Sequence, residues 1–185
     1  MKTNKRRPAL PIIMPRRKAK EKARAKAAGL NYGGLAAAML LSLIAGSIGG
    51  LATYPKIATW YAGLNKPSFN PPNWLFGPAW TILYLLMGAA AFLVWRKRAA
   101  DKRANEALAY FAVQFFFNIL WSFAFFGAQS PLYGLAVIVM LYAAVLVTIW
   151  KFWKIDRNAA LLLLPYLAWI TFASVLNYYS FILNP

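Results

Sequence analysis

The sequence predicts an all-α membrane protein built as a bundle of five transmembrane helices. One observation is composition, since 61% of the 185 residues are hydrophobic and only 14% are charged, whereas soluble domains average about 25% charged residues. A second is the presence of five long apolar runs separated by short links, each long enough to cross a hydrocarbon core of about 30 Å. The third is that the basic residues gather in alternate links. Together these observations exclude a soluble globular domain.

The chain divides into a basic tail and a membrane domain. Residues 1–28 hold eleven of the 21 basic residues and one acid, Glu21, so this segment cannot bury enough apolar surface to fold alone. We expect a disordered cytoplasmic tail lying on membrane lipid, with an organelle transit peptide and an RNA-binding arm as the alternatives. Residues 29–185 form the predicted membrane domain, whose helices are expected at about 30–53, 75–95, 107–126, 131–152 and 159–183.

The positions of the charges predict the orientation of the bundle. With five crossings, the tail, the 96–106 link and the 151–158 link share one side and hold nineteen of the 21 basic residues, while Lys56 and Lys66 lie on the other. The positive-inside rule therefore predicts a cytoplasmic tail and an outward-facing first loop. This bias favours a bacterial cell membrane, with an organelle membrane as the alternative. Because the charges lie in links and not over a folded face, no nucleic-acid partner is expected.

The first helix carries small residues at a spacing of four, which allow another helix to approach closely. The partner is either a helix of the same bundle or the first helix of a second copy in a homodimer. The residues of this row are Gly34, Ala38, Ser42, Gly46 and Gly50.

The loop between the first two helices is rich in aromatic residues and prolines. Its prolines prevent a continuous helix, and its composition is unlike that of a solvated tether. We expect an ordered lid over a pocket, and the alternative is an aromatic belt at the membrane surface. The lid residues are Lys66, Pro67, Pro71 and Pro72, with Trp60, Tyr61 and Trp74 as its aromatic residues.

Aromatic side chains and neutral amides recur at helical spacing in three helices. Trp80 and Tyr84 share a stripe in the second helix, and Trp169 lies in a similar stripe of the fifth. Gln114, Asn118 and Asn177 should point into the bundle, because unpaired polar groups are costly in a membrane. These amides either form hydrogen bonds between helices or line a pocket between the aromatic stripes. A pocket of this kind suits a large, flat, mostly apolar ligand.

Several kinds of chemistry lack their usual residues. The chain has no cysteine and no histidine, so thiolate and imidazole metal ligands and the commonest general base are missing. No catalytic triad, paired-carboxylate cluster or phosphate-binding glycine loop is found. We therefore expect no catalytic residues of the ordinary kind, no metal site and no required cofactor.

Four motifs resemble the TspO/translocator-protein family, the tryptophan-rich sensory proteins. They are WYxxLxKPxxxPPxW from Trp60 to Trp74, WxxLYxxMG from Trp80, QxxxNxxWxxxFFG from Gln114 and PYxxWxxFAxxLN from Pro165. The resemblance spans about residues 46–177 and is specific in order and spacing.

The resemblance implies a five-helix bundle, a homodimer and a pocket closed by the first loop. It implies that porphyrins such as protoporphyrin IX and haem bind there, together with other planar hydrophobic molecules. Carried over position by position, the ligand-binding residues would be Trp60, Tyr61, Trp74, Asn118, Trp121, Tyr133, Trp169, Ala173 and Asn177. Animal members also bind cholesterol, but the basic residue that their motif places after Leu-Asn-Tyr-Tyr does not follow Tyr179 here.

The residues and the resemblance together lead us to expect a membrane receptor or sensor, and the resemblance implies porphyrins as its ligands. Two alternatives stand beside it. One is a carrier of tetrapyrroles, lipids or sterols across the membrane, and the other is an enzyme that degrades porphyrins in light, with tryptophan as redox partner.

Overall fold

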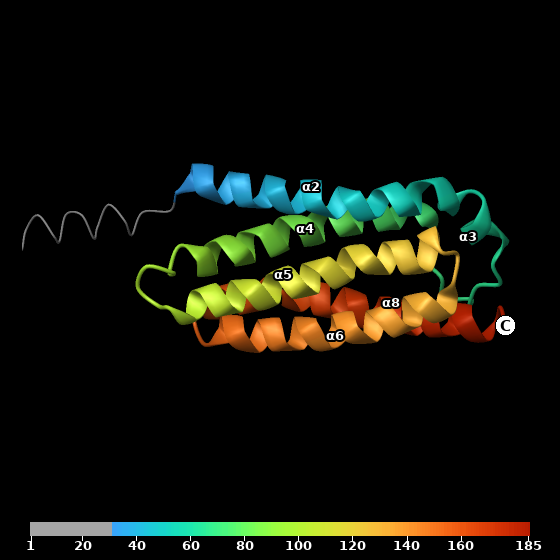
Figure 1. Cartoon of the computed structure of the whole chain (residues 1–185). Helices are drawn as coiled ribbons and strands as arrows, with labels where there is room; N and C mark the ends of the chain where they lie inside the picture. Colours follow the sequence, from blue (N-terminus) through green and yellow to red (C-terminus); the bar gives the residue numbers. More distant parts are fainter. Residues whose placement is uncertain (1–30) are drawn as a thin grey trace, which may run out of the picture. The chain divides into compact units, whose positions relative to one another are not determined.

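The computed structural model describes residues 31–185. Five long apolar helices form its unit Gly33–Pro185 (Figure 1). This confirms the predicted all-α, five-helix membrane fold. The predicted basic tail, residues 1–28, lies outside the described residues. The elements are α2 (Tyr32–Ile57), α3 (Trp60–Gly63), α4 (Asn73–Trp95), α5 (Arg103–Ser122), η1 (Phe123–Gly127), α6 (Pro131–Trp153), α7 (Arg157–Leu161) and α8 (Leu164–Ile182).

The first long helix is longer than the sequence predicts. Its end is expected near residue 53, ahead of Pro55, but α2 continues to Ile57 and keeps the proline in its last turns. Proline removes one backbone donor, and the helix ends within two residues of it. Thr59 then donates its hydroxyl to the Pro55 carbonyl oxygen at 3.0 Å, which satisfies one of the terminal acceptors.

The third long helix ends in a wider turn. From Phe123 to Gly127 the chain forms the π-helical turn η1, in which the Ala128 N–H donates to the Phe123 carbonyl at 2.7 Å. A π turn holds an extra residue relative to an α turn. It lets the adjacent Phe125 and Phe126 both bury their rings, which successive residues of a straight helix at a bundle surface rarely do.

The fifth predicted helix, residues 159–183, is interrupted. Asp156 caps α7 by accepting hydrogen bonds from the N–H groups of Asn158 and Ala159, so the helical region begins two residues before the prediction. A turn then separates α7 from α8, which carries Pro165 in its first turn. Proline is tolerated there because the first N–H groups of a helix have no intrahelical acceptor.

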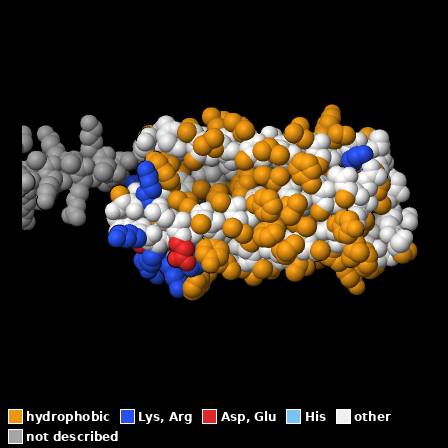
Figure 2. Space-filling view, viewed as in Figure 1, with side chains coloured by type: hydrophobic (Ala, Val, Ile, Leu, Met, Phe, Trp, Pro, Cys, Tyr) orange, Lys and Arg blue, Asp and Glu red, His pale blue; other side chains and the backbone are white. Residues whose placement is uncertain are grey.

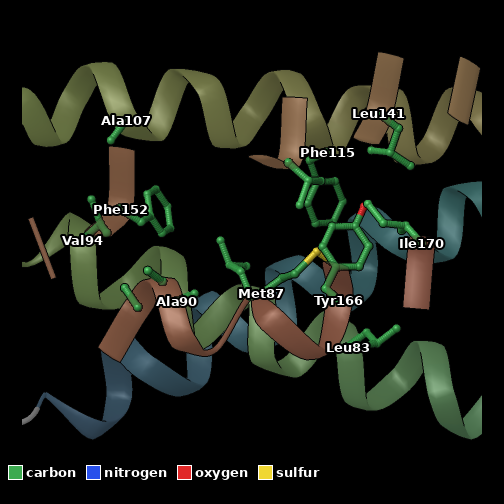
Figure 3. Packing of buried hydrophobic residues seen from close by; sticks show 14 of the residues in the cluster. Leu83, Met87, Ala90, Val94, Ala107, Phe115, Leu141, Phe152, Tyr166 and Ile170 are labelled. Carbon is green, nitrogen blue, oxygen red and sulfur yellow. The ribbon is translucent and has the colours of Figure 1, made fainter. Parts of the chain in front are cut away.

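The apolar core lies between α4, α5, α6 and α8. Met87 of α4, Phe115 of α5, Leu141 of α6 and Tyr166 of α8 are among its buried members. Figure 3 shows these side chains converging between the helices. Among the described residues, none of the buried members of this core comes from α2, although Ala45 of α2 packs against it.

The remaining long helix, α2, packs on this four-helix core through small residues. A Cβ on Gly88 of α4 would lie 2.6 Å from the carbonyl oxygen of Ala38 and from the Cα of Met39, so the two backbones nearly touch. The large side chains of α2 point outward, with Leu41 66% exposed and Leu51 74% exposed. In a membrane this apolar face contacts lipid or another protein.

The row of small residues predicted on α2 winds around the helix. Ser42 and Gly46 are buried, but the next buried position is Gly49, whereas Gly50 is exposed. With 3.6 residues per turn, a spacing of four drifts by about 40° at each step. Gly50 therefore points about 160° away from Gly34, and the two cannot serve one packing face.

Candidate functional site

A cavity of about 360 Å³ lies between α2, α4, η1 and α8, in the half of the bundle nearest α3. Its lining is mostly aromatic and small side chains. From α2 come Leu43, Gly46, Ser47, Gly50, Thr53, Tyr54 and Ile57; from α4, Asn73, Phe76, Gly77, Trp80, Thr81 and Tyr84; and from the remaining elements, Tyr61, Trp121, Ser122, Phe125, Phe126, Trp169, Ala173, Leu176, Asn177 and Ser180.

Tryptophans from three helices form the cavity walls. Trp80 stacks on Tyr84 with ring centroids 5.5 Å apart, and it meets Trp169 edge to face at 6.3 Å. Trp121 stacks on Phe125 at 5.4 Å. Because each ring is held by another ring, the walls are rigid, and rigid aromatic faces favour a flat partner.

An asparagine fixes the orientation of one of these tryptophans. The Trp121 indole N–H donates to Asn177 Oδ1 at 3.0 Å, and Asn177 Nδ2 donates to the Pro131 carbonyl at 2.7 Å. The amide therefore uses both its acceptor and its donor in holding α5, α6 and α8 together. It borders the cavity, yet its main observed role is to position Trp121.

A second asparagine lies behind the wall. Asn118 accepts a hydrogen bond from the Tyr84 hydroxyl at 2.8 Å and donates one to the Tyr166 hydroxyl at 3.0 Å. It is buried and does not line the cavity. This amide links α4, α5 and α8. Of the two roles that the sequence allows for the amides, Asn118 therefore has the first, hydrogen bonding between helices.

The polar groups of the lining are few and uncharged. The hydroxyls of Ser47, Thr53 and Thr81 donate to carbonyls of their own helices. The Trp169 indole nitrogen, in contrast, is buried and has no hydrogen-bond partner among the described residues. A buried donor without an acceptor is unfavourable, so a ligand with an acceptor atom facing Trp169 would satisfy it.

The segment 58–72 is attached to two parts of the bundle. Near its start, Trp60 packs edge-on against Phe125 with centroids 5.3 Å apart. Further along, Phe69 meets Tyr179 of α8 at 5.3 Å. The Asn65 N–H donates to Asn184 Oδ1 at 2.9 Å, and Asn184 Nδ2 donates back to the Asn65 carbonyl at 3.0 Å. These contacts hold the segment against both η1 and the end of α8.

Tyr61 is the residue of this segment that reaches the cavity. Its hydroxyl donates to Asn70 Oδ1 at 2.8 Å, and the Lys66 ammonium lies 4.9 Å from its ring centroid. Burial raises the pKa of Tyr61, while the hydrogen bond with Asn70 acts in the opposite direction. Lys66 also donates to the carbonyls of Ala62 and Leu64, so it closes the short helix α3.

The structure brings five of the nine predicted ligand-binding residues to the cavity: Tyr61, Trp121, Trp169, Ala173 and Asn177. Asn118 and Trp60 support its walls from behind, as described above. The other two lie apart from it. Trp74 is 71% exposed at the start of α4, and Tyr133 is 60% exposed in the first turn of α6.

The predicted ligand-binding set contains no lining residue of α2. Gly46, Ser47, Gly50 and Thr53 look like helix-packing residues in the sequence, and small side chains give no sign of bordering a cavity. Trp80 and Tyr84 also lie outside that set. A sequence signal for them exists, because they are four residues apart in one aromatic stripe of the second helix and Trp169 lies in a similar stripe of the fifth.

Comparisons with known proteins agree with the motifs. The model of the TspO/MBR family matches residues 38–183. The chain is 46% identical over 150 residues to the tryptophan-rich protein TspO of Archaeoglobus fulgidus, covering 81% of this chain and 96% of that protein. It is 43% identical over 125 residues to the tryptophan-rich sensory protein of Cereibacter sphaeroides, covering 68% and 77%. Identity to the human translocator protein is 38% over 120 residues, covering 64% and 71%.

Proposed function

Because this chain belongs to the TspO/MBR family, we propose that it is a membrane receptor or sensor that binds porphyrins, such as protoporphyrin IX and haem, in the cavity between α2, α4 and α8. The observation that carries this proposal is the aromatic wall formed by Trp80, Trp121 and Trp169. These rings offer flat apolar faces to a flat apolar macrocycle, and stacking of this kind adds about 0.5–1.5 kcal/mol per pair beyond burial.

The size of the cavity supports a small-molecule ligand. Its volume of about 360 Å³ lies within the range of about 300–1,000 Å³ that small-molecule sites occupy. Gly50 and Gly77, which both line it, have open space where a side chain would stand. A ligand wider than the cavity therefore has room to extend between α2 and α4.

The charges around the cavity favour one orientation of a porphyrin. A protoporphyrin carries two carboxylates on one edge, whereas the lining that the described residues form contains no Lys, Arg, Asp or Glu. The cavity reaches Ile57 and Asn73, at the end of the bundle where Lys56 and Lys66 are the basic residues of the described chain. We expect the apolar edge to enter first and the carboxylates to remain near these lysines.

The names of the relatives support a sensing role. One relative is named a tryptophan-rich sensory protein. A receptor needs a site that holds its ligand in one geometry, and the ring–ring contacts and the Trp121–Asn177 hydrogen bond provide such a site.

Titration of the purified full-length protein with protoporphyrin IX tests this proposal. The change is Ala173→Trp, which places an indole inside the cavity. The matched control is Ala143→Trp, which adds the same side chain at an exposed position of α6. Both variants gain one tryptophan, so quenching of tryptophan fluorescence can be compared directly. We expect at least a tenfold loss of affinity in the first variant and an unchanged affinity in the second.

Equal affinities in the two variants would contradict the proposed site, provided that both unfold at the same temperature as the unchanged protein. Absence of any quenching in the unchanged protein would contradict porphyrin binding as such.

A carrier is the second candidate, favoured by the relatives named translocator proteins. Transport requires the cavity to open on both sides of the membrane. Proteoliposomes loaded with porphyrin would then show flux that depends on the protein and is lost in Ala173→Trp. Binding without such flux leaves the receptor as the function.

A further inference from the structure

One end of the bundle is strongly basic. Where α4 leads into α5 and α6 leads into α7, the described chain has eight basic and three acidic residues. Figure 2 shows the Lys and Arg side chains gathered at this end, next to apolar side chains of the helix ends. This surface lies on the opposite end of the bundle from α3 and the cavity, so it has no part in the proposed function.

Each of the three acids here is already paired with a base. Asp156 pairs with Lys97 at 2.8 Å, Asp101 with Arg103 at 2.8 Å, and Glu106 with Lys151. Lys97 also donates to the Ile155 carbonyl at 2.9 Å, which ties the end of α4 to the link between α6 and α7. Among the remaining bases, Arg98, Lys102, Lys154 and Arg157 form no ion pair with an acid of the described chain.

Three of those bases lie over tryptophans. The Arg98 guanidinium is 3.6 Å from the ring centroid of Trp95, and the Lys154 ammonium is 3.5 Å from that of Trp150. Arg157 lies 5.6 Å from the ring centroid of Trp153. Each ring covers one side of its cation and restrains it, while the other side keeps N–H donors that no described acid uses.

We propose that these three cation–tryptophan pairs form a binding site for the headgroups of anionic phospholipids. The tryptophans are 44%, 55% and 47% exposed, in chain order, and they lie at the ends of the transmembrane helices α4 and α6. Indole rings prefer the headgroup level of a membrane. The pairs thus hold positive charge at the depth where lipid phosphates lie.

The chemistry of the surface favours lipid over a soluble anion. A phosphate diester accepts charge-assisted hydrogen bonds from guanidinium and ammonium groups, and acyl chains extend the contact along the apolar sides of α4 and α6. A soluble phosphate would gain only the first of these interactions. A tryptophan under each cation, in place of a polar residue, suits a site at the headgroup level of the membrane.

Native mass spectrometry of the full-length protein in mild detergent tests the site. Phosphatidylglycerol and phosphatidylcholine with identical acyl chains are added in turn, and the dissociation constant for the first bound lipid is measured. We expect phosphatidylglycerol to bind more tightly. Lys154→Gln should weaken its binding about fivefold, and the triple variant Arg98→Gln, Lys154→Gln, Arg157→Gln should abolish the preference over phosphatidylcholine.

Lys102→Gln is the matched control, because it removes the same charge from the same end at an exposed position. The basic residues 1–28 are present in every variant, so they do not contribute to the differences. The proposal predicts less than a twofold loss in the control. An equal loss of affinity in Lys102→Gln and Lys154→Gln would overturn the proposal, because it would show diffuse electrostatic attraction. Equal affinities for phosphatidylglycerol and phosphatidylcholine in the unchanged protein would also overturn it. Competition by millimolar glycerol phosphate would show a soluble-anion site and would overturn the lipid assignment.

Discussion

Replacing Gly88 with alanine should weaken the contact between α2 and α4. The new methyl group would lie 2.6 Å from the Ala38 carbonyl oxygen and from the Met39 Cα, both backbone atoms of α2. Ordinary contacts of a Cβ begin near 3.4 Å, so the two helices must separate by about 0.8 Å. A flexible side chain can rotate away from such a clash, but a helix backbone cannot.

The size of the effect follows from two opposing terms. Overpacking of a tight interface costs about 1–3 kcal/mol, whereas alanine stabilises a helix interior by about 0.5–1 kcal/mol relative to glycine. We therefore expect the free energy of unfolding to fall by about 0.5–2 kcal/mol. Gly50→Ala provides the control, because nothing lies within 4 Å of the added methyl group. In that variant only the higher helix propensity of alanine acts, so the free energy of unfolding should be unchanged or raised.

The assay is unfolding of both variants in mild detergent by increasing fractions of dodecyl sulfate, followed by far-ultraviolet circular dichroism. Gly88→Ala should unfold at a lower fraction than the unchanged protein, and Gly50→Ala should not. If the two variants shift together in the same direction, α2 is not held on α4 by this close approach.

Three further outcomes follow from the site and its surroundings. Asn118→Leu leaves the buried Tyr166 and the partly buried Tyr84 without their hydrogen bonds, so the free energy of unfolding should fall by about 1–3 kcal/mol. Asn105→Leu, at an exposed position of the same helix, should change the free energy of unfolding little. Trp121→Phe removes the indole that lines the cavity and should weaken protoporphyrin binding several-fold, whereas Trp74→Phe, outside the lining, should not; fluorescence titration compares the two. Because burial raises the pKa of Tyr61, its neutral form stabilises the fold below about pH 10. That contribution is lost as the pH rises through the raised pKa, so the unchanged protein should lose stability on this rise more steeply than Tyr61→Phe in thermal melts.

The number and placement of the long helices could be predicted because amino-acid composition alone marks a membrane-spanning segment. Runs of apolar residues without internal charge have one stable solution in a membrane, and all five runs became spans. The local breaks were harder. Whether Pro165 kinks a helix or begins a new one depends on the turn before it, and the π turn at Phe123 depends on how Phe125 and Phe126 pack. Neither is encoded in hydropathy.

The candidate site could be predicted in part, for a related reason. Trp121, Trp169 and Asn177 enter the predicted set through the family resemblance, and for Trp169 and Asn177 the helical spacing and the cost of an unpaired polar group in a membrane point the same way. Trp74 and Tyr133 have the same residue types but lie at helix starts, where a membrane surface also favours aromatic rings. Residue type alone does not distinguish these environments, and only the packing of the helices shows which rings turn inward.

The wall contributed by α2 shows a different limit. Glycine and serine borders of a cavity arise from what the neighbouring helices leave unfilled, so they carry no chemical signature. Gly46 lies under the ring of Tyr84, while Gly50, one turn later, borders open space. Both glycines line the cavity, but the drift of the row around α2 leaves only Gly46 in close contact with a neighbouring side chain, and that drift is predictable from helix geometry.

A crystal structure of the protein with protoporphyrin IX bound would locate the ligand without reference to any variant. We expect the macrocycle inside the cavity, in contact with Trp80, Trp121 and Trp169, with its carboxylates toward Lys56 and Lys66. A macrocycle on the outer surface of the helices, with the cavity unchanged, would contradict the assignment of this site.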